Sequence, residues 1–241
     1  MKLYRKKRSL KKKIVDLLMI LGAFFFLILI FNNQIKYAFI NNKVEMYTKS
    51  ITSISPNEIK KNEEKKAVYD IDKVVAVSDA SLLESVMNTS EYDNSIVGFV
   101  SVPSVGVYVT IFKGLANSNL LYGAGTVKPD QKMGEGNYVL ASHKLENPNL
   151  LFTPLLNSVE GQNIYLTDKT NIYRYEIKEK LVVLPTRGDL MDDEVGKKLI
   201  TLITCYDMSG EKRFIVRGEL KEAWEYKKAP QNVVQAFSQN Y

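Results

Sequence analysis

The chain has 241 residues, with 33 Lys and Arg, 27 Asp and Glu, a net charge of +6 and one cysteine. Eight basic residues lie within residues 1–13, so residues 32–241 carry 25 basic and 26 acidic side chains, a net of −1. A nucleic-acid-binding domain needs a basic surface on its folded part, so we expect no nucleic-acid partner. A single thiol forms no internal disulfide, so Cys205 is either a buried, inert side chain or one kept for its reactivity.

The N-terminal residues predict a membrane anchor. Residues 14–31, "IVDLLMILGAFFFLILIF", follow the basic segment and are apolar except for one acid, Asp16. About 18–20 apolar residues are enough to cross a bilayer, whereas the apolar part of a cleaved signal peptide, the alternative, usually has about 7–15. No small-residue cleavage pattern follows. We therefore predict a cytoplasmic tail over 1–13, an uncleaved transmembrane helix over 14–31, and an extracellular location for the rest.

Residues 32–77 mix both signs of charge without an apolar period, as in "SPNEIKKNEEKKAVYD". This composition predicts an unordered juxtamembrane stalk. The next segment, "SDASLLESVMN" over 78–88, has apolar residues on one helical face and Ser78 or Asp79 as a cap, so it predicts a short helix.

From about Ile96 the chain changes to short β-branched and aromatic runs separated by turn residues. The runs are "VGFVSV", "VYVTIF", "NYVLAS", "QNIYLT", "YRYEIKEKLVVL", "KLITLITC" and "RFIVRGEL", and "GAG" is among the separators. Such a series predicts a mainly β domain, a closed barrel or a sandwich. We expect one or two helical turns within 147–158, and a tail over 227–241 that is either a short helix or disordered.

Cys205 ends one of these predicted strands, where "LITLITC" gives way to polar "YDMSGEK". A hairpin centred on Ser209 would place Cys205 directly opposite Arg213, with both side chains on one face. A guanidinium beside a thiol favours the thiolate and can donate to an oxyanion. The alternative for Arg213 is an ordinary solvated charge on an edge strand.

His143, the only histidine, follows the predicted strand "NYVLAS". Catalysis by a thiol needs a neighbouring base or cation, and imidazole is the usual one. A lone histidine is more often a surface residue, so the spacing alone leaves a Cys/His enzyme and this alternative open.

The motifs "TLITC", with an arginine eight residues later, and "ASHK" resemble those of the sortases, cysteine transpeptidases that anchor surface proteins to the Gram-positive cell wall. The segments "IFKGLANSNLLYGAGTVK" and "EGQNIYLTDKTNIYRYEI" resemble class A, housekeeping-type members, especially streptococcal ones. The resemblance covers about residues 78–225. It implies a catalytic domain over 78–226 that folds as a closed eight-stranded sortase-type β-barrel with one or two short helices.

The resemblance also implies which residues act. It assigns catalysis to His143, Cys205 and Arg213, and substrate binding to Ala141, Ser142, Val183, Pro185, Ile203 and Thr204. The implied reaction cleaves LPxTG-type sorting signals between Thr and Gly through a thioester. The surface protein then passes to the amine of a lipid-linked peptidoglycan precursor at the cell membrane.

Some features differ from particular members of the family. The acidic cluster that binds calcium in staphylococcal sortases has no match, and "DLMDDE" over 189–194 is as compatible with a solvated loop, so we expect no metal or cofactor. Pilin-polymerising sortases carry an Asp-Pro-aromatic lid and often a C-terminal span, and neither is visible here. Two competing hypotheses are an unrelated cell-wall cysteine enzyme and a non-enzymatic anchored barrel that binds surface-protein tails.

Overall fold

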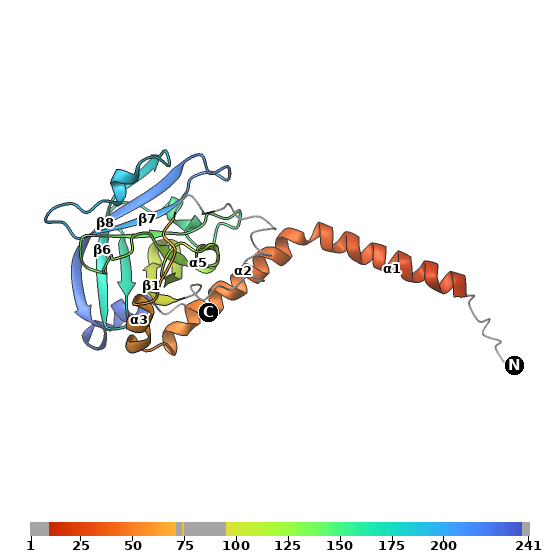
Figure 1. Cartoon of the computed structure of the whole chain (residues 1–241), viewed down its shortest axis with the longest axis horizontal. Helices are drawn as coiled ribbons and strands as arrows, with labels where there is room; N and C mark the ends of the chain where they lie inside the picture. The colour runs from red at the N-terminus through yellow and green to blue at the C-terminus, as the bar shows by residue number, and fades with distance from the viewer. Residues whose placement is uncertain (1–9, 71–73, 75–94, 238–241) are drawn as a thin grey trace. The chain divides into compact units, whose positions relative to one another are not determined.

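The computed structural model describes residues 10–70, 74 and 95–237 (Figure 1). The chain divides into two compact units, Met1–Ile40 and Asn41–Tyr241. The helix predicted over 78–88 lies outside the described residues.

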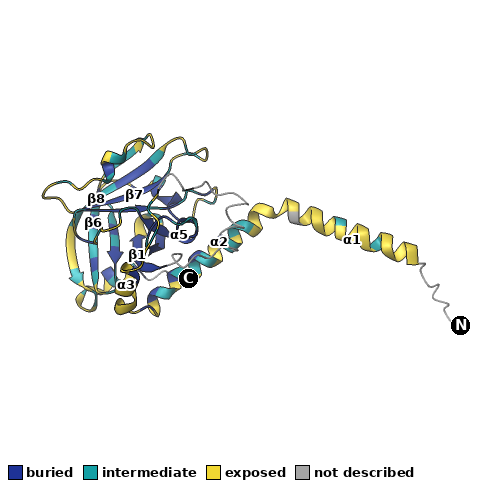
Figure 2. Cartoon of the chain, in the orientation of Figure 1, coloured by how far each residue is buried: buried dark blue, intermediate teal, exposed yellow. Residues whose placement is uncertain are grey.

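The first unit contains α1 (Leu10–Ile30) and the beginning of α2 (Asn32–Lys49). Side chains of α1 are exposed along most of its length (Figure 2). Within the described residues, no helix taken singly has the length and apolar composition to cross a membrane. Leu10–Leu27 and Asn32–Thr52, which form a bent pair, reach that length and composition only when they are taken together.

The second unit is built on a closed barrel of eight strands in the order β1-β2-β3-β4-β7-β8-β6-β5. The strands are β1 (Ile96–Val102), β2 (Val107–Phe112), β3 (Ala124–Thr126), β4 (Asn137–Ala141), β5 (Asn163–Thr167), β6 (Asn171–Val183), β7 (Leu199–Cys205) and β8 (Arg213–Glu225). Two neighbouring pairs, β2–β3 and β4–β7, are parallel, and the others are antiparallel. The predicted closed eight-stranded barrel is confirmed.

The seven predicted runs all form strands, and β3 is the strand that the sequence pattern missed. It occupies the end of "GAG", which we predicted as a break. Glycine is required there because a Cβ on Gly125 would lie 2.4 Å from the carbonyl oxygen of Gly114. The pairing of Gly125 with Ala141 on β4 makes this short segment a strand, so its structure depends on distant residues.

Short helices lie between the strands and after the last one. They are η3 (Pro103–Val105), α5 (Asn117–Tyr122), η4 (Thr153–Asn157), η5 (Gly188–Met191), η6 (Tyr226–Lys228) and α6 (Gln231–Gln235). The helical turn predicted within 147–158 is η4. The described part of the C-terminal tail is ordered: Phe237 is buried against Tyr108 and Tyr165, and Ser101 Oγ donates to the carbonyl oxygen of Ala236 at 2.6 Å.

The prediction of an unordered stalk was wrong for residues 41–63. The second half of α2 is followed by η1 (Ser50–Thr52) and α3 (Pro56–Glu63), and these elements bury Val44, Ile51, Ile54 and Ile59. The apolar residues are spaced widely among charges, so no run of them is visible in the sequence. Ser55 caps α3 by accepting from the backbone N–H of Glu58 at 3.2 Å, which favours the helix despite the charged composition.

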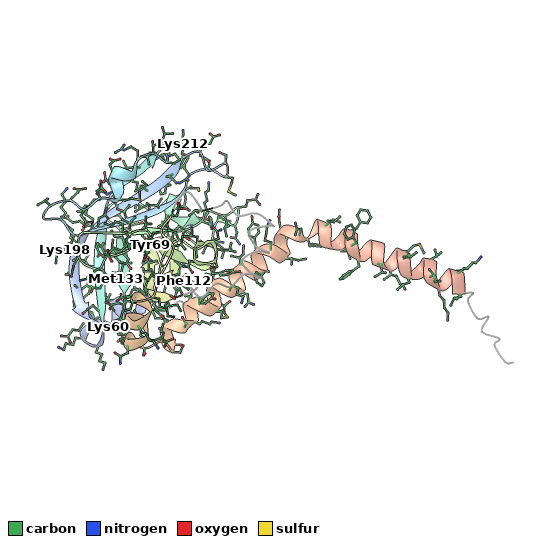
Figure 3. The ribbon with its side chains drawn as sticks, in the orientation of Figure 1. Lys60, Tyr69, Phe112, Met133, Lys198 and Lys212 are labelled. Carbon is green, nitrogen blue, oxygen red and sulfur yellow. The ribbon has the colours of Figure 1, made fainter. Side chains whose placement is uncertain are left out.

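Specific contacts join this segment to the barrel. The ring of Tyr47 on α2 meets that of Phe112 on β2 edge-on at 5.1 Å between centroids. Figure 3 labels Phe112 among the side chains of the barrel unit. The buried Asn62 donates through Nδ2 to the carbonyl oxygen of Ile96 at 2.9 Å, and Lys169 Nζ donates to that of Ile51 at 2.6 Å. Residues 41–63 are therefore part of the folded barrel unit.

Candidate active site

Strands β4 and β7 bring His143 and Cys205 to one end of the barrel. The two strands are parallel, with Ala141 paired to Ile203, and the backbone N–H of Ser142 donates to the carbonyl oxygen of Ile203 at 3.1 Å. His143 lies two residues beyond Ala141, and Cys205 lies two residues beyond Ile203. The carboxyl ends of neighbouring parallel strands lie at the same edge, so the only histidine and the only cysteine of the chain share this edge.

The hairpin between β7 and β8 pairs Cys205 with Arg213, as predicted from their equal spacing about Ser209. The backbone N–H of Tyr206 donates to Lys212 O at 2.9 Å and closes the turn. Asp207 shapes its interior by accepting hydrogen bonds from the hydroxyl of Ser209 and from the backbone N–H groups of residues 211 and 212. A local set of contacts thus fixes the register that places a guanidinium opposite the thiol.

The guanidinium of Arg213 is partly buried, and its Nη1 donates to the carbonyl oxygen of Gly210 at 2.7 Å. This bond holds the side chain against the turn. The arginine fork carries several further N–H groups, which can donate to an acceptor placed beside Cys205.

His143 is half-buried after the end of β4, and burial lowers its pKa to about 4. The imidazole is therefore neutral near pH 7 and can accept a proton from a thiol. Lys144 Nζ donates to the carbonyl oxygen of Tyr206 at 2.6 Å, so the segments that follow β4 and β7 are also tied together by a side chain.

An apolar floor lies on the strand face that carries Cys205 and Arg213. It consists of buried Val139, Leu190, Ile203 and Ile215 together with partly buried Val127, Ala141, Leu181, Val183 and Met191. Ile203 shares its strand face with Cys205, and Ile215 shares its face with Arg213. The floor brings together three predicted substrate-binding residues, Ala141, Val183 and Ile203.

The other members of the floor were missed from the sequence. Leu181 and Ile215 could have been found by a two-residue step along a strand from Val183 and Arg213. Leu190 and Met191 belong to η5, a helix of four residues that is too short to give a periodic signal in the sequence.

Three predicted substrate-binding residues lie outside this floor. Ser142 and Thr204 are buried on the opposite face from their neighbours, and Ser142 Oγ donates to the carbonyl oxygen of Gly123 at 2.5 Å. Pro185 is exposed in the segment after β6. Their contacts with substrate stay predictions.

Comparison with known proteins decides the family. The sequence profile of the sortase domain matches residues 100–221. Sortase A of Streptococcus agalactiae is 38% identical over 233 residues, which cover 95% of this chain and 91% of that protein. The chain belongs to the sortase family.

Other relatives agree with this membership. Sortase A of Listeria monocytogenes is 38% identical to this sortase over 231 residues, covering 92% of the chain and 97% of the relative. The crystal structure of Listeria monocytogenes sortase A, at 37% identity, covers 59% of this chain and 96% of that one with a TM-score of 0.55. Sortase C-3 of Streptococcus pneumoniae shares the fold, with a TM-score of 0.61 at 18% identity, covering 81% of this chain and 98% of the other.

Sortases are cysteine transpeptidases, so this sortase is an enzyme whose chemistry requires a thiol. Within the described residues, no three His, Cys, Asp or Glu side chains are grouped so that they could hold a metal ion. The acidic segment 189–194 is paired with basic groups instead: Asp189 with Arg187, Asp193 with Lys128, and Glu194 with two cations.

Proposed function

We propose that this sortase is a class A-type enzyme that cleaves LPxTG-type sorting signals between Thr and Gly and transfers the surface protein to a peptidoglycan-precursor amine. The observation that carries the proposal is the pairing of Cys205 with Arg213 at the end of an apolar floor, next to the strand that leads to His143. A thiol, a cation and an imidazole at the ends of three neighbouring strands supply a nucleophile, an oxyanion donor and a proton carrier.

In the acylation step, the thiol of Cys205 gives its proton to the neutral imidazole of His143. The sulfur then attacks the carbonyl carbon of the Thr–Gly bond, and Arg213 donates hydrogen bonds to the oxygen on which negative charge develops. The tetrahedral intermediate collapses as the C–N bond breaks. The protonated imidazole delivers its proton to the leaving glycine amine, and a thioester with Cys205 remains.

In the transfer step, an amine attacks the thioester carbonyl and loses a proton to His143, which returns it to the departing Cys205 sulfur. Water at about 55 M competes with the amine. The amine is favoured only if it is held in position, since orientation can contribute about 7–11 kcal/mol to an intramolecular reaction. The two-step sequence predicts ping-pong kinetics.

The proposed location is the cell membrane, with residues 14–31 as a single-pass anchor, the basic residues 1–13 in the cytoplasm and the barrel outside. The support is the apolar composition of α1 and its exposed surface, together with the basic segment that precedes it. The lipid-linked peptidoglycan precursor would then be presented on the same surface as the barrel.

The test is to incubate the full-length protein in detergent with a labelled LPxTG peptide, with and without a glycine or alanine amine. We expect slow hydrolysis without the amine and a new amide product with it. Prior treatment with iodoacetamide should stop both. Retained peptide binding without any cleavage would favour a non-enzymatic binding module, and a product formed only with a lysine side-chain amine would favour a pilin-polymerising enzyme.

A further inference from the structure

The loop that joins β6 to β7, residues 184–198, supplies Leu190 and Met191 to the apolar floor. The backbone hydrogen bonds described between its own residues are local turns, such as Asp192 N–H to Asp189 O at 3.2 Å. Local turns do not determine where a loop sits on the barrel. At the end of the loop, the backbone N–H of Leu220 on β8 donates to the carbonyl oxygen of Lys198 at 2.8 Å. Nearer to Leu190 and Met191, side chains make the polar contacts between the loop and the strands.

One set of contacts comes from Asn137, the first residue of β4, which is only 1% exposed. Its Nδ2 donates to the carbonyl oxygens of Leu190 and Asp192 at 3.0 and 3.1 Å, and its backbone N–H donates to Asp193 Oδ1 at 2.8 Å. Thr201 Oγ1 of β7 donates to Asn137 Oδ1 at 2.8 Å and fixes the orientation of the amide. Asn137 thus holds the loop backbone on both sides of Met191.

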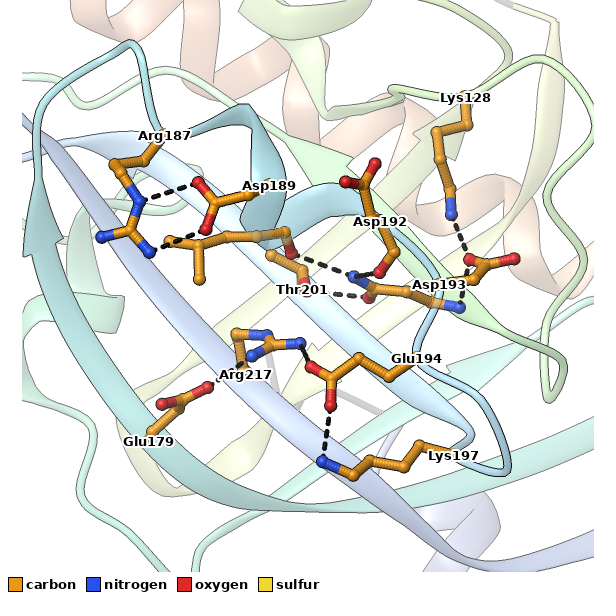
Figure 4. A network of polar contacts seen from close by, with 12 residues as sticks. Lys128, Glu179, Arg187, Asp189, Asp192, Asp193, Glu194, Lys197, Thr201 and Arg217 are labelled. Atoms are coloured by element: carbon orange, nitrogen blue, oxygen red, sulfur yellow. Dashed lines mark hydrogen bonds and ion pairs between the residues drawn. The ribbon is translucent and has the colours of Figure 1, made fainter.

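A second set comes from Arg217 of β8 (Figure 4), and the side chain of this arginine is 12% exposed. Its Nη1 donates to Glu179 of β6 at 2.6 Å, and its Nη2 pairs with Glu194 of the loop. Glu194 also pairs with Lys197, and these two cations, Lys197 first, lower its pKa to about 2. The guanidinium therefore bridges a carboxylate of the barrel and a carboxylate of the loop, and the loop carboxylate stays charged at any working pH.

We propose that Arg217 is a positioning residue, which holds the 184–198 loop so that Leu190 and Met191 complete the floor on which the sorting signal binds. The proposal rests on the proposed function, because it assigns the floor to the sorting signal. It concerns residues away from the reacting atoms, since Arg217 lies four residues along β8 from Arg213. The planar fork of arginine matters here because it reaches two carboxylates at once, which a lysine ammonium does with poorer geometry.

Glu194→Gln tests the proposal from the loop side. This substitution keeps the shape of a side chain that is 36% exposed, so it removes the ion pair without disturbing the barrel. The matched control is Glu222→Gln. Glu222 also pairs with an arginine across β6 and β8, Arg174 at 3.1 Å, and it is 50% exposed. The hydrogen bonds of Arg174 go to Glu222 and Asn163, which both lie outside the loop.

Two measurements are made on the full-length enzyme and both variants. Hydrogen exchange of peptides from 184–198 reports whether the loop is held, and this readout needs no activity. Steady-state kinetics with the LPxTG peptide reports KM and kcat separately. For Glu194→Gln we expect faster hydrogen exchange in the loop and a KM up to about fivefold higher, the upper end for an ion pair that is only partly shielded from water. The kcat should be unchanged. Glu222→Gln should match wild type in both.

Arg217→Lys and Arg217→Gln test the arginine side of the bridge. Both should raise KM, and the increase should be smaller for the lysine variant, which keeps the positive charge. Combining Glu194→Gln with Arg217→Gln should raise KM no further than Arg217→Gln alone, because both remove one bridge. Unchanged loop exchange in Glu194→Gln would overturn the bridge, and faster exchange with an unchanged KM would overturn its role in binding. Absence of transpeptidation by the wild-type enzyme would instead reject the proposed function, and the exchange data would still report on the bridge.

Discussion

At the scale of single residues, substitution of Cys205 should affect catalysis much more than stability, because Cys205 ends β7 with its side chain only partly buried. We predict that Cys205→Ala abolishes both cleavage and transfer. Its free energy of unfolding should fall by much less than the about 2–5 kcal/mol that truncating a large buried side chain costs. Urea unfolding and the peptide assay measure the two effects. A loss of several kcal/mol would identify Cys205 as a structural residue.

The half-buried imidazole of His143 should make the stability of the fold depend on pH. Burial lowers its pKa to about 4, below the ordinary value near 6.5, so the unfolded chain binds an extra proton between these two values. The contribution of the neutral imidazole to stability is complete above about pH 6.5 and declines as the pH falls toward 4.

Comparison with His143→Gln isolates this contribution from those of the carboxylates. As the pH falls from 7 to 4.5, the unfolding free energy of wild type should decrease more than that of the variant. Parallel pH–stability curves for the two proteins would show that the imidazole is as accessible to protons in the folded state as in the unfolded one. Activity should be lost in the variant at every pH.

Arg213 is predicted to stabilise the oxyanion. Arg213→Ala should lower kcat/KM by about 10²–10³, the cost of losing one such donor elsewhere, with little change in stability. Arg213→Lys should recover only part of this, because an ammonium restores charge without the planar fork. Arg217, on the same strand, is unsuitable as the control for Arg213 because it forms ion pairs with Glu179 and Glu194. Arg174→Ala serves instead, and equal effects of Arg213→Ala and Arg174→Ala would remove Arg213 from the mechanism.

At the scale of elements, the segment 41–63 is predicted to stabilise the barrel. Burying each of its isoleucines contributes about 1.5–3 kcal/mol before the cost of ordering the chain. A protein that begins at residue 78 should therefore unfold at a lower urea concentration than one that begins at residue 41. Equal midpoints would show that the segment docks without stabilising the fold.

A single substitution gives the same test without truncation. Asn62→Ala leaves the buried carbonyl oxygen of Ile96 without its donor, so the unfolding free energy should fall by about 1–3 kcal/mol. Asn42→Ala, at an exposed position of α2, is the matched control and should change stability by less than about 0.5 kcal/mol. A loss in Asn42→Ala as large as that in Asn62→Ala would mean that the effect does not come from the Asn62 contact.

At the scale of the whole molecule, residues 1–31 are predicted to hold the enzyme in the membrane and to take no part in the chemistry. The full-length protein should stay in the membrane fraction after a carbonate wash, with Met1 to Ile40 present in its intact mass. A form lacking residues 1–31 should be soluble and cleave the peptide at the same rate. A mature protein that starts beyond Phe31 would contradict an uncleaved anchor.

The sequence by itself was sufficient for the local features of this sortase. The β-branched runs predicted seven of the eight strands, and the apolar residues 14–31 predicted most of α1. The pairing of Cys205 with Arg213 was also predictable, because a seven-residue turn joins two consecutive strands and its register depends on nearby residues alone.

Only the tertiary structure decided the features that join distant segments. The parallel pairing of β4 with β7 places His143 beside the Cys205 hairpin, although 61 residues separate the two in the chain. Likewise, β3 is a strand because it pairs with β2 and β4. Residues 41–63 are ordered because they pack on the barrel. The charges of Glu194 and Arg217 resemble solvated surface groups in the sequence. Their role depends on a bridge between a loop and two strands, and such long-range pairings leave no local pattern in the residues that make them.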